Sequence, residues 1–117
     1  MVVEVRFYTR LNGRSPVEDE IDSLPTRAAA HVYEVLEGIE IHGLNAPRVV
    51  FRPIQGKLWE IKTNVPGVGG YRIFYCLLQK DVMLLLHSYE KRSQKAPRRH
   101  IETAMERMAD AIRREGK

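Results

Sequence analysis

The fold is centred on the stretch YRIFYCLLQKDVMLLLHSY, residues 71–89. It holds two apolar runs, 71–78 and 81–89, which are separated by Gln79 and Lys80. Runs of aromatic and aliphatic residues of this length are typical of β-strands, and a two-residue break between them is typical of a hairpin. Because each run carries apolar residues at both odd and even positions, we expect both strands to be buried on their two faces in the centre of a sheet.

Three further strands are expected to complete this sheet. LWEIKT (58–63) and VVEVRFY (2–8) alternate between apolar and charged residues, which is typical of strands with one buried face. RVVFRPI (48–54) is interrupted by Pro53, which lacks an N–H for the ladder, so we place this strand at an edge of the sheet or ending there. The glycine-rich segment 64–70 is expected to be a turn, and it lacks the Lys-Ser/Thr pair of a phosphate-binding P-loop.

Two helices are expected between the first strand and the second. The first has Ser15 as its N-cap and Pro16 as its first helical residue, with acidic residues in the first turn, and it ends near Pro25. The second begins near Thr26 and ends at Gly43, because glycine readily adopts the backbone angles that follow a helix. The short joint between them predicts a helical hairpin.

A third helix is expected near the C-terminal end, with Pro97 as its first residue. Its apolar residues fall at helical spacing and form one stripe bordered by charged residues. The residues of this stripe are Ile101, Ala104, Met105, Met108 and Ile112. The complete order, β-α-α-β-β-β-β-α, predicts one α+β domain over residues 1–117 with a mostly antiparallel sheet.

The composition is that of a soluble globular protein, with 44% hydrophobic and 29% charged residues. Cys76 is the only cysteine and lies in an apolar run, so we interpret it as a small buried hydrophobic residue. No Cys/His cluster has the spacing of zinc ligands, and we expect neither a metal nor another cofactor. The charges of Glu4 and Arg6 exclude a signal peptide, and the longest apolar run, Val82–Leu86, is too short to cross a membrane. We therefore expect a cytoplasmic protein of a prokaryote.

The positive charge is concentrated near the C-terminal end. The net charge of the chain is +4, and residues 90–117 alone hold nine Lys/Arg and five Asp/Glu, so residues 1–89 are neutral overall. The segment KRSQKAPRR (91–99) has five cations and no acid. Such a density of cations indicates a polyanionic partner, either nucleic acid or an acidic protein, and it also fits a solvated basic surface.

Polar residues of three expected strands stand at positions that can share one face of the sheet. These residues are Glu60, Lys62, Arg72, His87 and Tyr89. Strict alternation within 81–89 also groups Met83 and Leu85 with the last two. Alternation assigns faces within a strand but not the pairing between strands, so the common polar and mostly cationic face is a hypothesis.

This set of side chains suits cleavage of RNA without a metal, in which the 2′-hydroxyl attacks the adjacent phosphate. Arg72 and Lys62 could stabilise the negative charge of the transition state, since a guanidinium can hold two phosphate oxygens. Glu60 or His87 could act as the base or the acid, and Tyr89 could stack on a base or orient the phosphate. The cations expected to hold the RNA backbone are Lys91, Arg92, Lys95, Arg98 and Arg99.

Each of these residues also fits a structural role. Arg72 and Glu60 could form an ion pair across strands, which the residues alone favour slightly. His87 could be a satisfied interior histidine, and Tyr89 could cap the core with its hydroxyl in water. Lys62 and Glu60 could belong to a solvated face. Three further histidines are interpreted as surface residues of the helices, without a role: His31, His42 and His100.

Three segments together resemble the RelE/HigB toxin superfamily, and within it the phage-derived HigB-like branch of type II toxin–antitoxin systems. They are LWEIK (58–62), YRIFY (71–75) after a glycine turn, and LLLHSYEKRSQKAP (84–97), and a basic amphipathic helix follows them. The resemblance covers nearly the whole chain. It implies a RelE-like fold, with a curved sheet flanked by the helical hairpin and the last helix.

The resemblance also implies a function. Such toxins are ribosome-dependent mRNA endonucleases that work without a metal and are neutralised by a cognate antitoxin. The arginine of the family's YR pattern falls on Arg72, the basic position of the preceding strand on Lys62, and the polar position of the last strand on His87. The basic positions that follow fall on Lys91, Arg92 and Lys95. The ParE branch shares the fold but inhibits gyrase, so the resemblance leaves two other functions open, a gyrase-inhibiting toxin and a non-catalytic nucleic-acid-binding protein derived from a phage.

The partners implied are a helix-turn-helix antitoxin, the ribosome with its mRNA, and operator DNA reached through the antitoxin, with no membrane. We expect the antitoxin to cover either the cationic face or the apolar edges of the helical hairpin, from Ala28 to Leu36. An acidic antitoxin would associate in a salt-sensitive way.

Overall fold

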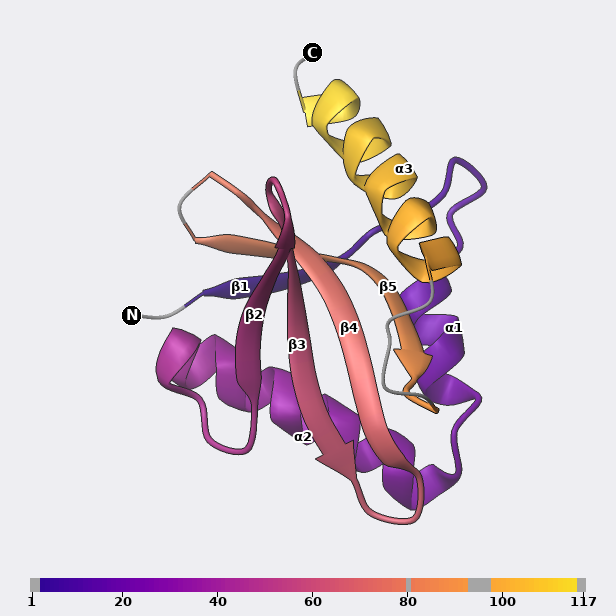
Figure 1. Ribbon diagram of the computed structural model, residues 1–117, viewed down its shortest axis with the longest axis vertical. Coiled ribbons are helices and arrows are strands. Elements are labelled where there is room, and N and C mark those ends of the chain that lie inside the picture. The colour runs from indigo at the N-terminus through magenta and orange to yellow at the C-terminus, as the bar shows by residue number, and fades with distance from the viewer. Residues whose placement is uncertain (1–2, 80, 93–97, 116–117) are drawn as a thin grey trace.

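The computed structural model describes residues 3–79, 81–92 and 98–115. Five strands form one mixed sheet in the order β1-β5-β4-β3-β2, in which only β1 and β5 run parallel, within the described part of the chain. The chain is therefore an α+β protein with a mostly antiparallel sheet, as predicted, and it is compatible with a RelE-like fold (Figure 1). The elements along the chain are β1 (Glu4–Phe7), α1 (Pro16–Asp22), α2 (Thr26–His42), a short 3₁₀ helix (Gly43–Asn45), β2 (Val50–Gln55), β3 (Leu58–Val65), β4 (Gly69–Leu78), β5 (Val82–Glu90) and α3 (Arg98–Glu115).

Helices cover both faces of the sheet and create two hydrophobic cores. In Figure 1, α2 crosses behind the strands, and the core on that side joins α1 and α2 to the sheet through residues such as Ile21, Val32 and Ile73. The opposite core joins α3 to the sheet through residues such as Met108 and Cys76. The cysteine is buried, as predicted. The strands β5, β4 and β3 occupy the centre of the sheet, and β2, which contains Pro53, lies at its edge.

The first two helices begin and end close to the predicted residues. The hydroxyl of Ser15 accepts a hydrogen bond from the backbone N–H of Glu18, and Pro16 begins α1. Gly43 ends α2 with a φ of 61°, a conformation that suits glycine.

Most large apolar residues of α2 face the core, whereas Ile41 is 58% exposed. Ala28, Val32, Val35 and Leu36 are all buried against the sheet. The core thus uses most of the hydrophobic stripe of this amphipathic helix, and coverage of the segment from Ala28 to Leu36 by an antitoxin stays a prediction.

The register between β4 and β5 contains a β-bulge. Phe74 pairs with His87, whereas the next residue, Tyr75, pairs with Leu85. Leu86 is thus the extra residue of β5, and a bulge of this kind leaves one residue without a partner and bends the strand.

The bulge corrects the predicted faces of β5. Met83 and Leu85 belong to the core of α1 and α2, whereas Leu86 and Tyr89 belong to the core of α3. The ring of His87 stacks against residues of the α3 core as well. The grouping of Met83 and Leu85 with His87 and Tyr89 is therefore wrong, because one inserted residue reverses the alternation of side chains.

The helix α3 turns a slightly different face to the sheet than its apolar stripe predicts. Ala104, Met108 and Ala111 are buried, whereas Ile112 is 42% exposed. Pro97, the predicted first residue, lies outside the described residues. Within the described part of the chain, none of the helices combines the length and apolarity that a bilayer-spanning helix needs.

Candidate active site

Lys62, Arg72 and Tyr89 form a row across three adjacent strands. The register pairs Lys62 with Arg72 between β3 and β4, and Arg72 with Tyr89 between β4 and β5. Side chains at directly paired positions stand next to each other on one face of a sheet. The expected registration of these three residues on a common face is therefore observed, and we refer to them as the cationic row.

A second row contains Glu60, Phe74 and His87, in the same pairing of strands. Glu60 is 0% exposed and forms its ion pair with Arg52 of β2, with Nη2 and Oε1 2.9 Å apart. The expectation of a single buried face in 58–63, with Glu60 on a solvated face, is therefore wrong, because α3 and the sheet also bury this side of β3. No carboxylate among the described residues lies within 4.0 Å of the guanidinium of Arg72. The ion pair between Arg72 and Glu60 is thus not formed, because Arg52 is the direct cross-strand neighbour of Glu60.

Several buried polar atoms on this face lack a hydrogen-bond partner. They are both carboxylate oxygens of Glu60, the Nε of Arg72 and the hydroxyl of Tyr89, which make four of the five such side-chain atoms in the described residues. The contact of Glu60 with Arg52 is close enough for an ion pair, but its angles are not those of a hydrogen bond. A buried polar atom without a partner costs about 1–3 kcal/mol, and here Glu60 offsets part of this cost through its ion pair with Arg52 and its interaction with the hydroxyl of Tyr89.

Tyr89 is buried rather than exposed to solvent. It is 5% exposed, and the ring of His100 lies flat on its ring with centroids 4.1 Å apart. Burial, assisted by the charge of Glu60, raises the pKa of Tyr89 to about 12. The ring face that an RNA base would use is thus covered by His100, and the interpretation that the hydroxyl of Tyr89 lies in water is wrong, because that oxygen is buried.

Both ring nitrogens of His87 are engaged. Its Nδ1 lies 3.1 Å from Nη1 of Arg107, and its Nε2 lies 2.6 Å from Nδ1 of His100. Burial lowers the pKa of His87 to about 4, and the neighbouring Arg107 and His100 act in the same direction. Although two imidazoles meet here, no group of three or more His, Cys, Asp or Glu within the described residues is arranged to hold a metal ion.

Comparison with known proteins places the chain in a family. Residues 19–109, most of the sequence, match the family model described as phage derived protein Gp49-like (DUF891). The chain belongs to the Gp49-like family. This family is associated with toxins of the RelE/HigB type. No curated protein matches the chain significantly.

The Gp49-like chain brings His100 and Arg107 into the site, although the sequence interpretation gave neither residue a role. His100 is partly exposed, as the interpretation of it as a surface residue of the helix implies, but its ring also contacts His87 and Tyr89. A signal was present in the sequence. His100, Ala104 and Arg107 are spaced by four and three residues, so they share the face of α3 that packs on the sheet.

The cations proposed to hold RNA occupy different surroundings in the Gp49-like fold. Lys91 lies beside Arg72, and the two approach across Gly70, where a Cβ atom would stand 3.3 Å from Nη1 of Arg72 and 3.4 Å from Cβ of Lys91. Burial lowers the pKa of Lys91, and the positive charge of Arg72 contributes. Arg92 is exposed and forms an ion pair with Glu90, at 3.1 Å.

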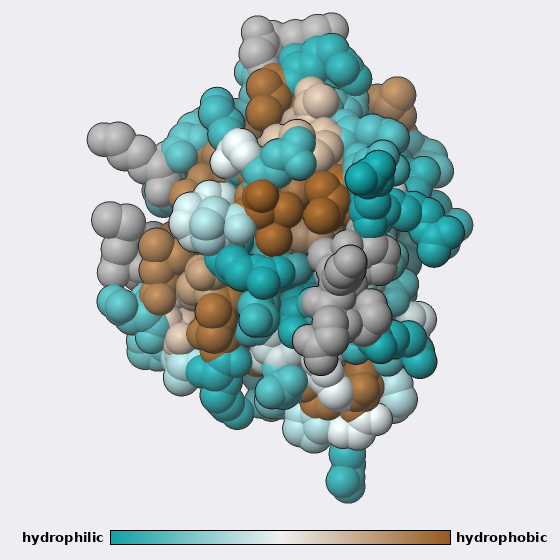
Figure 2. All heavy atoms as spheres, viewed as in Figure 1, coloured by the Kyte–Doolittle hydropathy of each residue, from teal (hydrophilic) through white to brown (hydrophobic). Residues whose placement is uncertain are grey.

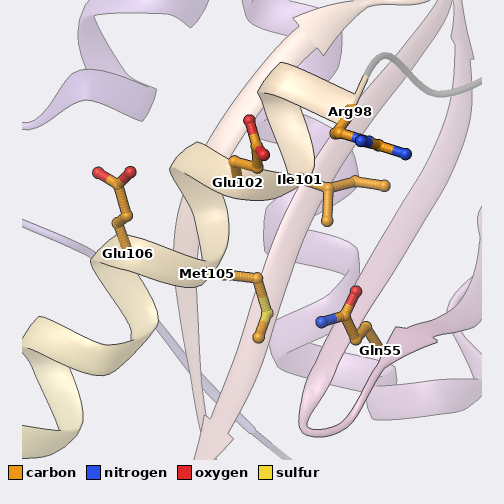
Figure 3. A pocket seen from close by; sticks show the side chains of 6 residues that line it. All are labelled: Gln55, Arg98, Ile101, Glu102, Met105 and Glu106. Carbon is orange, nitrogen blue, oxygen red and sulfur yellow. The ribbon is translucent and has the colours of Figure 1, made fainter.

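The remaining cations lie at the start of α3 or beyond the described residues. Arg98 and Arg99 are exposed there, and Lys95 lies outside the described part of the chain. Arg98 borders an open hollow of about 810 Å³ next to α3 (Figure 3). Figure 3 shows Ile101 and Met105 pointing toward Gln55 at the end of β2. Figure 2 shows hydrophobic residues gathered next to α3 on this side of the molecule, with hydrophilic residues around them.

Proposed function

We propose that this Gp49-like protein is the toxin of a type II toxin–antitoxin system that cleaves mRNA on the ribosome without a metal. The observation that carries the proposal is the cationic row. Lys62 and Arg72 stand directly opposite each other, and like charges at such positions destabilise a sheet. An anionic phosphodiester bound between them would be attracted by both cations and would offset their mutual repulsion.

In the proposed reaction the 2′-oxygen attacks the adjacent phosphorus while the bond from phosphorus to the 5′-oxygen breaks. The products are a 2′,3′-cyclic phosphate and a 5′-hydroxyl, and one proton passes from the 2′-hydroxyl to a base while another passes from an acid to the leaving oxygen. Arg72 and Lys62 stabilise the charge that develops on the phosphate oxygens. Glu60 is the proposed acid–base group, and His87 and Tyr89 hold the row in place.

Expression of the wild-type protein and of Arg72→Ala in bacteria, followed by mapping of mRNA 5′ ends, tests this function. Removal of one charge-stabilising group lowers cleavage by about 10²–10³-fold, so the variant should relieve growth arrest and lose the new 5′ ends. The matched control is Arg6→Ala, because Arg6 is an exposed strand arginine paired with Glu4 on β1. The control should remain toxic.

Three further measurements separate the alternatives. Cleavage of ribosome-bound mRNA by purified protein should leave 2′,3′-cyclic phosphate and 5′-hydroxyl ends, as attack by the 2′-hydroxyl requires. Inhibition of supercoiling by purified gyrase, together with growth arrest but no new 5′ ends, would replace the nuclease by a ParE-like toxin. Binding of nucleic acid without growth arrest would leave only a non-catalytic binding protein.

The proposed partner is an acidic helix-turn-helix antitoxin, which in turn contacts operator DNA. We assign the cationic row and the neighbouring Lys91 to the antitoxin, because their positive charges attract an acidic partner. An antitoxin seated there would block the RNA site directly.

A further inference from the structure

A chain of hydrogen bonds runs from Arg107 through His87 to His100 and determines where the ring protons lie. A guanidinium has only donors, so Nη1 of Arg107, which is 3.1 Å from Nδ1 of His87, makes that nitrogen an acceptor. The proton of a neutral His87 therefore lies on Nε2, which donates to Nδ1 of His100 at 2.6 Å. Since Nδ1 of His100 accepts, its own proton lies on Nε2.

Arg107 is itself held in place. The same Nη1 donates to the carbonyl oxygen of Leu86, the bulged residue of β5, at 2.9 Å. The bulge thus holds Arg107, the residue at which this chain of hydrogen bonds begins and which sets the tautomer of His87. A change of rotamer at Arg107 would remove both contacts, so the placement of this side chain controls the state of the two imidazoles.

The pair of histidines is built to remain neutral. Only one proton fits between the two facing nitrogens, and another on Nδ1 of His87 would point at the N–H of Arg107. Burial lowers the pKa of both histidines, and the neighbouring cations Arg107 and Arg99 of α3 act in the same direction. The other titratable group packed against the rings is Tyr89 of β5, which is neutral at physiological pH. No carboxylate in the described ranges lies within 4.0 Å of either ring.

His100 is partly exposed, and its Nε2 lies on the side of the ring away from the nitrogen that contacts His87. Its Nε2 has no hydrogen-bond partner among the described residues, and it is not one of the buried atoms that lack one. The ring lies flat on Tyr89, which is paired in register with Arg72. The donor therefore extends the row Lys62, Arg72, Tyr89 by one further polar group, contributed by α3.

On this geometry we propose that His100 is an RNA-binding residue, which donates its Nε2–H to a phosphate oxygen of the RNA held by Lys62 and Arg72. His87 and Arg107 are positioning residues, because they act on RNA only through the tautomer of His100. The inference rests on the proposed function, since the ligand is the same RNA. It assigns α3 a part in substrate binding. In this assignment the histidines do not transfer protons, and His100 acts as an uncharged hydrogen-bond donor.

An uncharged donor differs from an arginine in a measurable way. A cation that contacts a phosphate releases counterions, so its removal lowers the salt dependence of RNA binding as well as the affinity. Loss of the N–H of His100 should lower the affinity about tenfold and leave the slope of log K against log salt unchanged.

Two substitutions of similar size isolate this N–H. In His100→Gln the amide nitrogen falls near the position of Nε2, whereas in His100→Asn the shorter amide reaches only the position of Nδ1. Fluorescence anisotropy with a labelled single-stranded RNA, 2′-O-methylated so that it cannot be cleaved, should give near wild-type affinity for His100→Gln and about tenfold weaker binding for His100→Asn. Arg72→Ala should weaken binding and also reduce the salt slope by about one. Equal affinity of His100→Asn and the wild type would overturn the inference while RNA binding itself stands.

The tautomers are measured on the protein without RNA. Nitrogen-15 NMR of the imidazoles should show both His87 and His100 protonated on Nε2 and neutral from pH 6 to pH 8. Arg107→Met should release Nδ1 of His87 and bring the pair into titration within that range. A proton on Nδ1 of His100, or a positive charge at pH 7, would contradict the assignment whatever the protein cleaves. Absence of RNA binding by the wild type would reject the inference together with the proposed function, and the NMR result would show whether the hydrogen-bond chain itself is correct.

Discussion

Arg72 occupies a position that only its surroundings explain. A guanidinium between Tyr71 and Ile73 in a central strand looks out of place in the sequence. In the structure the two neighbours are buried in the core of α1 and α2, while Arg72 projects on the opposite face and donates from Nη1 to the carbonyl oxygen of Tyr71 at 3.1 Å. Its guanidinium lies over Gly70, and this close approach makes the glycine part of the site.

We predict that Gly70→Ala lowers mRNA cleavage several-fold with little effect on stability. The new Cβ would stand 3.3 Å from Nη1 of Arg72, so the end of this flexible side chain must move by a few tenths of an ångström. Small displacements of a charge-stabilising group are costly in catalysis. Quantitative primer extension on a target mRNA measures the effect, and thermal unfolding measures stability. Unchanged cleavage would show that the position of Arg72 over Gly70 is unimportant.

His87 makes the stability of the protein depend on pH. Its pKa is about 4 in the folded state and 6.5 in the unfolded reference, so the unfolded state binds more protons between these values. The contribution of neutral His87 to the free energy of unfolding is therefore fully present above pH 6.5, and it is lost as the pH drops from 6.5 towards 4. Because the ring partly reaches solvent, we expect a loss on the order of 1–2 kcal/mol.

Urea unfolding at pH 7.5 and at pH 5 measures this loss, and His87→Gln should remove most of it. The matched control is His42→Gln, which changes an exposed histidine at the end of α2 and should leave the pH dependence intact. A pH dependence of equal size in His87→Gln and the wild type would contradict the assignment to His87.

At the scale of elements, the bulge in β5 and the helix α3 build the site together. The extra residue Leu86 returns His87 and Tyr89 to the face that holds Arg72. The helix α3 is tied to the sheet by its own polar contacts, in which Asp110 accepts a hydrogen bond from the hydroxyl of Tyr8 at 2.7 Å. The helix then carries His100 onto the cationic row.

Two glycines of α2 should respond in opposite directions to replacement by alanine. Gly43 ends the helix with a φ of 61°, where a side chain is strained, so Gly43→Ala should lower the free energy of unfolding by about 1 kcal/mol. Gly38 lies inside the helix, and a Cβ added there would meet nothing within 4 Å, so Gly38→Ala should raise this free energy by about 0.5–1 kcal/mol. Urea unfolding at pH 7.5 compares the two. A stabilising Gly43→Ala would show that this end of α2 does not require glycine.

At the scale of the whole molecule, the arrangement of layers decides which charges are available to a partner. The net charge is +4, and the cations of the face beside α3 include Arg52, Lys62, Arg72 and Lys91, with Glu60 buried among them. Positive surfaces of this kind steer acidic partners and speed their association.

We predict that the association rate with the proposed acidic antitoxin falls at least tenfold between about 50 and about 500 mM NaCl, because salt screens attraction between separated charges. Stopped-flow fluorescence of the purified pair measures the rate. Lys62→Gln should reduce both the rate and its dependence on salt, whereas Lys57→Gln, a change of an exposed lysine in the β2–β3 turn, serves as the matched comparison. An association rate that is insensitive to salt would show that charge steering plays no part.

Local patterns in the sequence were sufficient for the elements and for most of the buried faces. Alternation in β1 and β4, the caps at Ser15 and Gly43, and the edge position of β2 all follow from interactions within a few residues. These interactions also placed Arg72 opposite its buried neighbours, and the family resemblance made it the first candidate for the phosphate. In β3 alternation was misleading, because packing buries Glu60 and leaves Trp59 exposed.

Tertiary packing alone decided the pairing of Lys62 with Arg72, the ion pair of Glu60 with Arg52 and the approach of His100 to Tyr89. Each joins residues from different elements, whose relative register no local pattern contains. The bulge in β5 was likewise decided by tertiary packing. Its one inserted residue moves every following side chain of β5 to the opposite face of the sheet. The sequence by itself thus determined which side chains were present for the proposed chemistry, and only the packing of α3 and the sheet determined which of them meet.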